Sequence, residues 1–414
     1  MVSVAIMGHG VVGSGVAEII TTHKNKLFSS IGEEIYIKKI LDLREFPQSP
    51  LADRFTKNFD EIINDLEIRI VVEVMGGTNP AYDYVKRCLL AGKSVVTSNK
   101  ELVAAHGAEL LKIAKENNAN FLFEASVGGG IPIIRPMNQC LVANIVDEIA
   151  GILNGTTNFI LTKMITEGMN FNDALKLAQD LGFAERNPEA DIEGHDACRK
   201  ICILASLAYG KHVYPQWVHT EGITGIDLDD VKYAESNKCV IKLIGRVKRL
   251  PDKKLDIIVA PMMIPKTSQL ANIDNEFNGI MVRGDCTGDV VFYGKGAGKL
   301  PTASAVVADV VDCVKHLKTR KYLFWTDSSG ENILPYEESV TAVYIRAQAE
   351  NKDGAYAEAK EVFGDIKPVV CKEAQTDTFA FITGEMKFGE ILDKAADLEA
   401  KGIKVLSKIR IGNL

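Results

Sequence analysis

The first 140 residues alternate short apolar runs with longer segments in which apolar residues recur at helical spacing. Segment 13–22, for example, places Val16, Ala17, Ile19 and Ile20 on one helical face. Strands are predicted at 2–7, 34–41, 68–74, 94–97 and 119–124, and helices at 13–22, 60–66, 80–91 and 102–117. Strands that alternate with helices form a parallel sheet covered on both faces. We therefore expect an α/β, Rossmann-like doubly wound domain over residues 1–136.

This strict alternation ends between residues 137 and 299. Helices are predicted there at 173–181 and 194–209, and strands at 255–261, 279–283 and 289–293. Such a mixed order predicts an α+β domain over 137–299. The long apolar segment that begins at Pro301 predicts a helix within 300–320, and we expect it to return to the first domain.

Residues 326–338 are polar and contain Gly and Pro, which is typical of a linker. The pattern after it predicts strand 339–350, helix 355–363, strands 369–374 and 378–383, helix 388–400 and strand 403–411. This β-α-β-β-α-β order is that of a ferredoxin-like domain, here expected over 339–414.

Charge and cysteine usage exclude several classes of protein. The formal net charge is −7, whereas nucleic acids and anionic membranes attract basic surfaces. No apolar run reaches the ~18 residues of a membrane span, and no basic region precedes the first apolar stretch, as a signal peptide would require. The eight cysteines are scattered without a CxxC pair. We therefore expect free thiols in a cytoplasmic protein.

A GxGxxG motif joins the first predicted strand to the first helix. Gly8 permits a tight turn, Gly10 leaves room for a pyrophosphate and Gly13 lets the helix pack on the strand. Val11 and Val12 complete the loop, whose helix N-terminus would face the phosphates. The strand, the helix and the downstream Asp42 together predict dinucleotide binding.

The second strand ends on groups that favour opposite cofactors. The Asp42 carboxylate would bind the free ribose hydroxyls of NAD and repel a 2′-phosphate. The nearby Arg44 and Arg54 would instead receive the 2′-phosphate of NADP. The sequence leaves the choice open.

Two more candidates follow predicted strands, at the edge where parallel sheets bind ligands. Lys100 ends the segment TSNK, where it could polarise a carbonyl or carry a proton. Glu124 precedes the glycine-rich run SVGGGI, in which inward carbonyls and one carboxylate would suit a hard cation. A hinge between domains would explain the same glycines.

The densest cluster of charged residues lies at 182–200. Asp196 and Lys200 are one helical turn apart, so their side chains share a face, and Glu185 and Asp191 can approach the same helix start. Carboxylates beside a lysine can hold an ammonium group and move a proton. A surface ladder of ion pairs is the alternative.

These segments together resemble the homoserine dehydrogenase family. The matching stretches are GHGVVGSGV, TSNK, EASVGGGIPII, LNGTTNFIL, DLGFAERNPEADIEGHDACRK and YGKGAGKLPTASAVVADV, which cover about residues 4–318. The resemblance implies reversible NAD(P)-linked conversion of L-homoserine to L-aspartate 4-semialdehyde, in threonine, methionine and isoleucine biosynthesis. It also implies that the middle domain serves catalysis and dimerisation, in a homo-oligomer of two or four subunits.

Residue roles follow from the same resemblance. Lys200, as proton donor, and Lys100 would be catalytic. The substrate would be held by Glu185, Asp191, Asp196, Thr156 and Gly155, and Thr78, Lys100, Gly296 and Gly298 would join the cofactor site. A sodium ion would take the carboxylate of Glu124 and the carbonyls of Val127, Gly129 and Ile131.

The C-terminal segment resembles an ACT domain, a module that binds amino acids and pairs with further copies. Its first turn is Lys352-Asp-Gly-Ala355, without the Pro-Gly pair usual in that family. Regulation by threonine and a role in assembly are both open. Two other functions also stay open for the whole chain: a different amino-acid dehydrogenase, and a non-catalytic sensor of nucleotides and amino acids.

Overall fold

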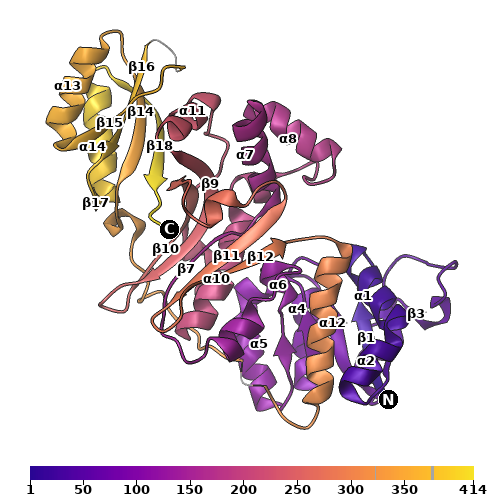
Figure 1. Cartoon of the computed structure of the whole chain (residues 1–414). Coiled ribbons are helices and arrows are strands. Elements are labelled where there is room, and N and C mark those ends of the chain that lie inside the picture. The colour runs from indigo at the N-terminus through magenta and orange to yellow at the C-terminus, as the bar shows by residue number, and fades with distance from the viewer. Residues whose placement is uncertain (322, 374–376) are drawn as a thin grey trace. The chain divides into compact units, whose positions relative to one another are not determined.

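The structure, a computed structural model, describes residues 1–321, 323–373 and 377–414. The chain packs into two compact units. The first contains residues 1–145, 199–215 and 292–330, and the second contains 146–198, 216–291 and 331–414. Figure 1 follows the chain from its indigo N-terminus to its yellow C-terminus.

The first unit is built on a parallel sheet of six strands, ordered β3-β2-β1-β4-β5-β6. The strands are β1 (Val2–Met7), β2 (Ile35–Leu41), β3 (Phe55–Thr56), β4 (Ile68–Glu73), β5 (Ser94–Thr97) and β6 (Phe121–Leu122). From β1 the chain builds the sheet outward to β3 on one side, and then from β4 to β6 on the other side. This reversal of the strand order between β1 and β4 is that of the Rossmann fold. The expected doubly wound sheet is confirmed.

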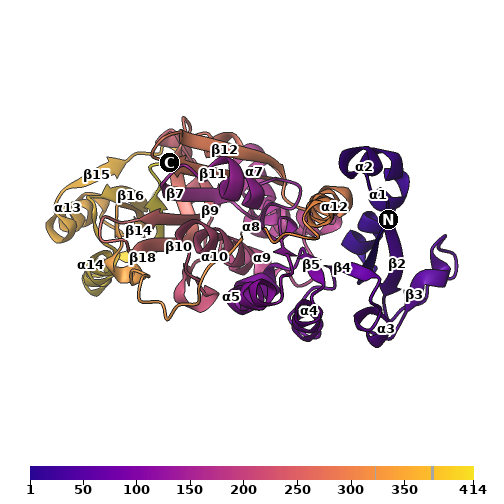
Figure 2. The same ribbon diagram turned by 90° about the horizontal axis from the view of Figure 1, so that it is seen from below.

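Helices cover both faces of this sheet. They are α1 (Val11–Thr22), α2 (Lys24–Ile31), α3 (Asp60–Ile63), α4 (Ala81–Leu90), α5 (Lys100–Glu116), α6 (Ala125–Gly128) and α12 (Lys299–Lys315). Figure 2 shows α1, α2 and α12 on one face and α3, α4 and α5 on the other. The helix α12 lies against α1, where a Cβ on Gly15 would come within 2.9 Å of Ala303 Cβ.

Three differences from the predicted elements have local causes. Helix α2 was not predicted, because none of its residues is buried and it therefore has no apolar stripe. Helix α3 ends at Ile63, three residues early, with only Ile62 buried. The strand expected at 119–124 is reduced to β6, because the backbone of Glu124 is already helical and leads into α6.

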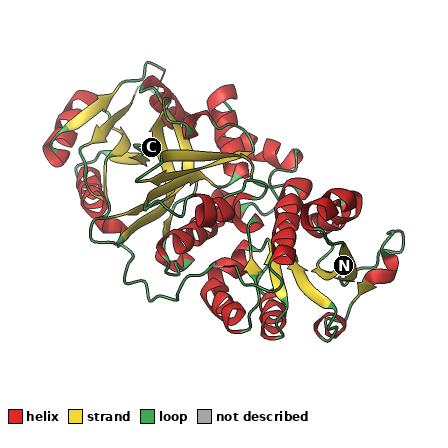
Figure 3. Cartoon of the chain, turned by 60° about the horizontal axis from the view of Figure 1, so that its bottom comes forward, coloured by secondary structure: helices red, strands yellow, loops and turns green. Residues whose placement is uncertain are grey.

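The second unit holds a mixed sheet of ten strands, drawn in yellow in Figure 3. Its order is β12-β11-β7-β9-β10-β18-β14-β16-β15, with β8 paired to β10. The strands before residue 300 are β7 (Val146–Ile152), β8 (His219–Thr220), β9 (Cys239–Arg249), β10 (Leu255–Pro265), β11 (Phe277–Gly284) and β12 (Gly288–Lys295). The long strands β7 and β9 were not predicted from the pattern, although the expected α+β class is correct.

The helices of the middle region include the predicted pair. They are α7 (Gly155–Glu167), α8 (Phe171–Asp180), α9 (Glu189–Ile192), α10 (His195–Tyr209) and α11 (Leu228–Ser236). Asn154 caps α7 by accepting a hydrogen bond from the Thr157 amide. Among the described residues no helix is long and apolar enough to cross a membrane.

The C-terminal segment has the predicted β-α-β-β-α-β order. Its elements are β14 (Val343–Gln348), α13 (Lys352–Phe363), β15 (Ile366–Val369), β16 (Thr378–Thr383), α14 (Phe388–Ala400) and β18 (Lys404–Ile411), preceded by β13 (Val340–Thr341), which pairs with β17 (Met386–Lys387). The order β18-β14-β16-β15 is that of a ferredoxin-like sheet. The two helices pack on a core that includes Ile345, Phe363, Phe381 and Ile391.

One predicted strand of this module was wrong. The strand expected at 369–374 is β15, which ends at Val369, because Gly364 ends α13 with a φ of +81° and the chain enters the sheet directly, burying Ile366. Residue 374, the last of the expected strand, lies outside the described residues.

The sheet runs without a break from the middle region into the C-terminal module. Strands β10 and β18 pair in parallel, Met262 with Arg410 and Met263 with Ile411. Both segments therefore belong to one compact unit. The domain boundaries expected at residues 136, 299 and 339 therefore remain predictions.

Candidate active site

The predicted site residues fall into both units. Those in the first unit are Gly8, Gly10, Val11, Val12, Gly13, Asp42, Arg44, Thr78, Lys100, Glu124, Val127, Gly129, Ile131, Lys200, Gly296 and Gly298. Those in the second are Gly155, Thr156, Glu185, Asp191 and Asp196.

The glycine motif lies between β1 and α1, at the point where the strand order reverses. Gly8 has a φ of +99°, and a Cβ there would come within 2.9 Å of the Val74 carbonyl. A Cβ on Gly13 would overlap the carbonyl of Gly8, whereas nothing lies within 4 Å of the position of a Cβ on Gly10. Because Gly10 caps α1 without a side chain and Val11 is 68 % exposed, the first amides of the helix are accessible. These features fit the pyrophosphate of a dinucleotide.

Asp42 is tied both to the glycine loop and to Arg44. Its Oδ2 accepts the His9 amide at 2.7 Å. Arg44 donates Nε to Oδ1 at 3.0 Å and Nη2 to Oδ2 at 2.9 Å. This pairing holds the pKa of Asp42 well below its usual range. The carboxylate therefore stays ionised with an exposed arginine beside it.

Arg54, the other candidate for a 2′-phosphate, is engaged elsewhere. Its Nη1 donates to the Ile37 carbonyl at 2.7 Å, and its guanidinium lies over the Tyr36 ring at 4.6 Å. Both contacts are to β2. Arg44 is thus the arginine that accompanies Asp42.

The carboxyl ends of β4 and β5 are joined by Glu73, which the sequence analysis did not single out. Its Oε2 accepts the Thr97 hydroxyl at 2.6 Å and its Oε1 accepts the Met75 amide at 2.8 Å. Burial raises the pKa of Glu73 above that of an ordinary glutamate. A carboxyl that ends an apolar strand was the available signal.

The loops that carry Thr78 and Lys100 are tied to each other. Asn99 caps α5, and its Nδ2 donates to the Gly77 carbonyl at 2.6 Å. Thr78 follows Gly77 directly, and Lys100 is the first residue of α5. The predicted residues Thr78 and Lys100 are therefore at neighbouring strand ends of the first unit.

The segment around Lys200 lies beside the start of α5. Arg199 Nη2 is 3.7 Å from Glu101 Oε1, and these residues are next in sequence to Lys200 and Lys100. Lys200 is buried, with 8 % of its surface exposed. The structure thus brings the two lysine-bearing segments together within the first unit.

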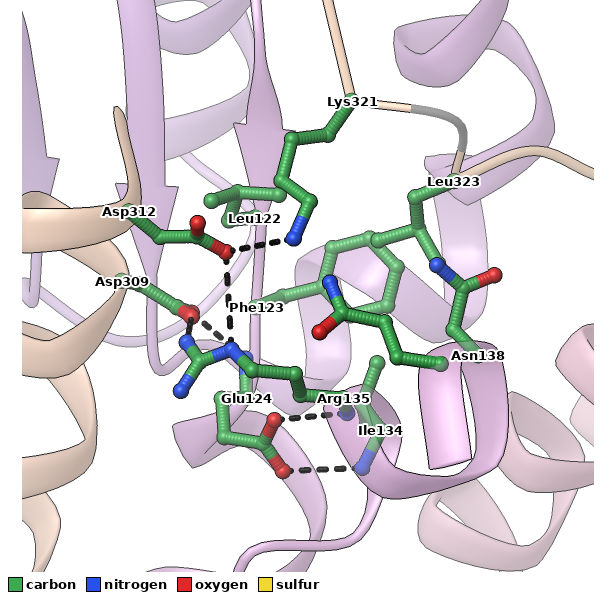
Figure 4. A pocket seen from close by; sticks show the side chains of 11 residues that line it. Leu122, Phe123, Glu124, Ile134, Arg135, Asn138, Asp309, Asp312, Lys321 and Leu323 are labelled. Carbon is green, nitrogen blue, oxygen red and sulfur yellow. Dashed lines mark hydrogen bonds and ion pairs between the residues drawn. The ribbon is translucent and has the colours of Figure 1, made fainter. Parts of the chain in front are cut away.

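The Glu124 carboxylate closes the glycine-rich loop on itself (Figure 4). It accepts three backbone amides, those of Ile133 at 2.6 Å, Ile134 at 2.8 Å and Arg135 at 2.7 Å. Asp309 of α12 accepts the Glu124 amide at 2.8 Å and pairs with Arg135. Burial raises the pKa of Asp309 to about 7.

The tip of this loop packs against a second glycine-rich loop, which spans residues 294–298. The Gly130 amide donates to the Lys295 carbonyl at 3.0 Å, and a Cβ on Gly129 would overlap the carbonyl of Gly296. Gly298, with a φ of +117°, precedes α12. Val127 and Ile131 are buried beside the turn. The backbones of the two loops are therefore in direct contact.

Asn154 gathers two of the predicted substrate carboxylates. Its Nδ2 donates to Asp191 Oδ1 at 2.7 Å and to Asp196 Oδ2 at 2.9 Å. Asp196 is 4 % exposed and lies in the first turn of α10. The sequence analysis quoted the segment around Asn154 but did not assign this residue a role.

The remaining substrate candidates differ in their surroundings. Thr156 donates its hydroxyl to the Phe183 carbonyl at 2.6 Å. A Cβ on Gly155 would meet the Glu276 carbonyl, so only glycine fits there. Glu185 is exposed, and its backbone carbonyl accepts Gln179 Nε2 at 3.2 Å. The Glu185 side chain takes no part in the hydrogen bonds that join Asn154 to Asp191 and Asp196.

The reversed strand order, the glycine turn and the accessible start of α1 are those of a dinucleotide-binding Rossmann domain. The Homoserine dehydrogenase family model matches residues 132–311, and the model of the homoserine dehydrogenase NAD binding domain matches residues 8–124. The chain belongs to the homoserine dehydrogenase family.

Relatives and solved structures of this family align with most of the chain. The homoserine dehydrogenase of Bacillus subtilis is 37% identical and covers 96% of this chain and 95% of its own length. That of Neisseria gonorrhoeae is 39% identical, covering 85% and 83%. The crystal structure of the enzyme from Thiobacillus denitrificans has a TM-score of 0.89 at 34% identity, covering 99% and 98%. A hyperthermophilic archaeal homoserine dehydrogenase in complex with NADPH has a TM-score of 0.64 at 29% identity, covering 75% and 97%.

Proposed function

We propose that Lys200 carries the proton in homoserine oxidation and that Lys100 assists it. The oxidation removes a hydride from the alcohol carbon and a proton from the hydroxyl, and leaves an aldehyde. A bound nicotinamide nucleotide supplies the acceptor for the hydride. The hydroxyl proton passes to the Lys200 amine, which acts as the general base in this direction of the reaction. The ion pair of Arg199 with Glu101 carries this proposal, because it joins the two lysine-bearing segments.

Asp191 and Asp196 hold the substrate ammonium group in this scheme. An ammonium group has three N–H donors, and two ionised carboxylates match it in charge and in hydrogen bonding. Thr156 and Gly155 shape the adjoining turn, and Glu185 supplies a further carboxylate. Gly8, Gly10 and the start of α1 bind the pyrophosphate, and Gly296 and Gly298 border the nicotinamide.

The coenzyme choice is proposed to rest on the Asp42–Arg44 pair. Asp42 accepts the ribose hydroxyls of NAD, and Arg44 swings from Asp42 to a 2′-phosphate when NADP binds. The exposure of the Arg44 side chain, 61%, leaves it free to do so. We therefore propose that both nucleotides are used.

A sodium ion beside the glycine-rich loop is a further proposal, and backbone carbonyls would carry most of it. Three amides already occupy the Glu124 carboxylate, which leaves about one of its four acceptor positions. Among the described residues, no group of three or more His, Cys, Asp or Glu could hold a metal ion. The carbonyls of Val127, Gly129 and Ile131 are thus the main ligands in this proposal. Sodium should raise activity modestly and EDTA should leave it unchanged; inhibition by EDTA would contradict the assignment.

The C-terminal module is proposed to be an ACT domain that binds threonine and contributes to a homodimer or homotetramer. Its strand order supports the fold, whereas threonine binding rests on the family resemblance. The same resemblance supports a place in the biosynthesis of threonine, methionine and isoleucine. The scattered cysteines, which include no CxxC pair, support a cytoplasmic location.

A spectrophotometric assay tests the activity directly. The purified chain is given L-homoserine with NAD or with NADP, and reduced nucleotide is followed together with the aldehyde product. Aldehyde formed in equal amount to reduced nucleotide is expected. Release of ammonia instead would point to an amino-acid dehydrogenase acting at the amine carbon, and binding without turnover would point to a sensor.

A further inference from the structure

The side chain of Asn154 both caps α7 and binds two carboxylates. It is 5 % exposed, and its Oδ1 accepts the Thr157 amide at 2.9 Å, which caps α7. Its Nδ2 faces the other way and gives one hydrogen bond to Asp191 and one to Asp196. One amide therefore uses its acceptor for the helix and both of its donors for carboxylates.

This arrangement matters because the two carboxylates repel each other. Asp191 belongs to the short helix α9 and Asp196 to the first turn of α10, so no single element sets their separation. A planar NH₂ group with two N–H bonds at a fixed angle bridges the two carboxylates and constrains it. Hydrogen bonds to charged acceptors are also stronger than neutral ones, so each favours the ionised carboxylate.

We propose that Asn154 is a positioning residue that holds Asp191 and Asp196 ionised and correctly spaced for the substrate ammonium group. The inference rests on the proposed role of these two aspartates in substrate binding. It goes beyond that role, because the cap of α7 requires only an acceptor at residue 154, whereas the carboxylates require two donors. An aspartate in place of Asn154 separates the two tasks.

The Asn154→Asp variant keeps the cap and loses both donors. It also adds a third acidic group beside the pair, which favours protonation of the cluster. The KM for homoserine should rise about 10-fold or more, and the KM for the nucleotide should stay within about 2-fold. The acid limb of the kcat/KM profile should move to higher pH. If Asn154→Asp fails to fold, Asn154→Ser keeps a hydroxyl cap and should also raise the homoserine KM selectively.

Thr157→Val is the matched control. The Thr157 hydroxyl donates to Asn154 O and to Asn154 Oδ1, both at 3.1 Å, so its loss alters only the acceptor side of Asn154. Both Nδ2 donors remain, and the homoserine KM and the pH profile should therefore stay unchanged. Equal increases in both KM values for Asn154→Asp, or the same changes in Thr157→Val, would overturn the inference and indicate a structural role only.

Asp191→Asn and Asp196→Asn separate the inference from the function on which it rests. If these variants raise the homoserine KM and the Asn154 variants do not, the inference fails and the substrate role stands. If neither aspartate variant affects the homoserine KM, the substrate role fails and the inference fails with it.

Discussion

Lys200 is the residue on which the proposed proton transfer depends most. Lys200→Ala should lower kcat about 10²-fold or more, because general acid–base groups contribute at least that much. Nucleotide binding, measured by fluorescence titration, should remain normal. The control is Lys176→Ala, which removes an exposed lysine paired with Asp180 one turn away on α8. A Lys200 variant with a kcat near that of the native enzyme would remove this residue from the mechanism.

Single substitutions of Arg44 and of Asp42 should shift the preference between NAD and NADP in opposite directions. Arg44→Ala frees Asp42 from its partner and removes the cation, so kcat/KM for NADP should fall relative to NAD, by about 10-fold. Asp42→Ala should shift the ratio the other way. Arg54→Ala is the control, since that side chain is held on β2. Equal changes of kcat/KM for NAD and NADP in either variant would show that the Asp42–Arg44 pair does not distinguish the two ribose groups.

The residues found only in the structure share a physical property. Gly8, Asp42 and Asp196 could be predicted because a local motif or spacing marks them. Asn154 and Glu73 act through partners 37 and 24 residues away, and no local pattern encodes those contacts. The sequence therefore marks candidate groups by local motifs, whereas Asn154 and Glu73 become candidates only through contacts with distant residues.

Among the elements, the end of α10 is joined to the segment that follows α12 by a buried histidine. His212 Nδ1 accepts the Trp325 indole N–H at 2.9 Å, and Nε2 bonds to the Ala104 carbonyl of α5 at 2.8 Å. Both bonds together require the neutral ring with its proton on Nε2. Burial lowers the pKa of His212 below its ordinary value of 6.5.

This histidine predicts a loss of stability in mild acid. Below pH ~6.5 the unfolded chain takes up a proton that the folded chain resists, so the unfolding free energy falls as the pH falls. Above pH ~6.5 the contribution is complete and changes no further. The Tm should therefore drop between about pH 7.5 and about pH 5, and His212→Gln should reduce that drop. His23→Gln, at an exposed position, should leave it unchanged; an unaltered pH dependence in His212→Gln would contradict the prediction.

Elements with a clear apolar period were predicted well, and those stabilised by distant contacts were not. Strands β1 and β5 and helix α14 have the predicted bounds. The long strand β9 continues into the charged residues Lys248 and Arg249, so its pattern is not that of a buried run. It is held instead by antiparallel pairing with β10 along its whole length. Pairing with β10, rather than a local apolar period in the sequence, therefore determines where β9 forms.

In the molecule as a whole, the C-terminal module is anchored in the second unit by charge as well as by the sheet. Arg346 of β14 is buried, donates Nε to Asp230 Oδ1 of α11 at 2.8 Å and also pairs with Asp227. Burial raises the pKa of Asp230 despite this partner. Buried charges are costly without partners. Removal of the module would therefore take away the guanidinium that pairs with Asp230.

This anchoring changes what truncation after Ser328 is expected to do. The sequence suggests a module on a separate linker, whose loss would spare the enzyme. In the structure, β18 pairs with β10 at Met262 and Met263, so truncation exposes this part of the β10 edge, where both side chains are buried. An exposed apolar edge promotes association between chains. The truncated protein should therefore have a lower Tm and form aggregates of increasing size in light scattering, whereas the full chain should keep one defined size.

Threonine should accordingly be tested on the full-length enzyme. Inhibition requires that threonine bind a less active arrangement more tightly than the active one. Millimolar threonine should then lower kcat or raise the homoserine KM, and it should also raise the Tm, because a ligand that binds only the folded chain stabilises it. Serine at the same concentration is the control for general amino-acid effects. A rise in Tm without inhibition would show that threonine binds without regulating catalysis, and neither effect would remove threonine as a ligand of the module. A truncated chain that kept its Tm and stayed dispersed would show instead that the module folds as a separate domain.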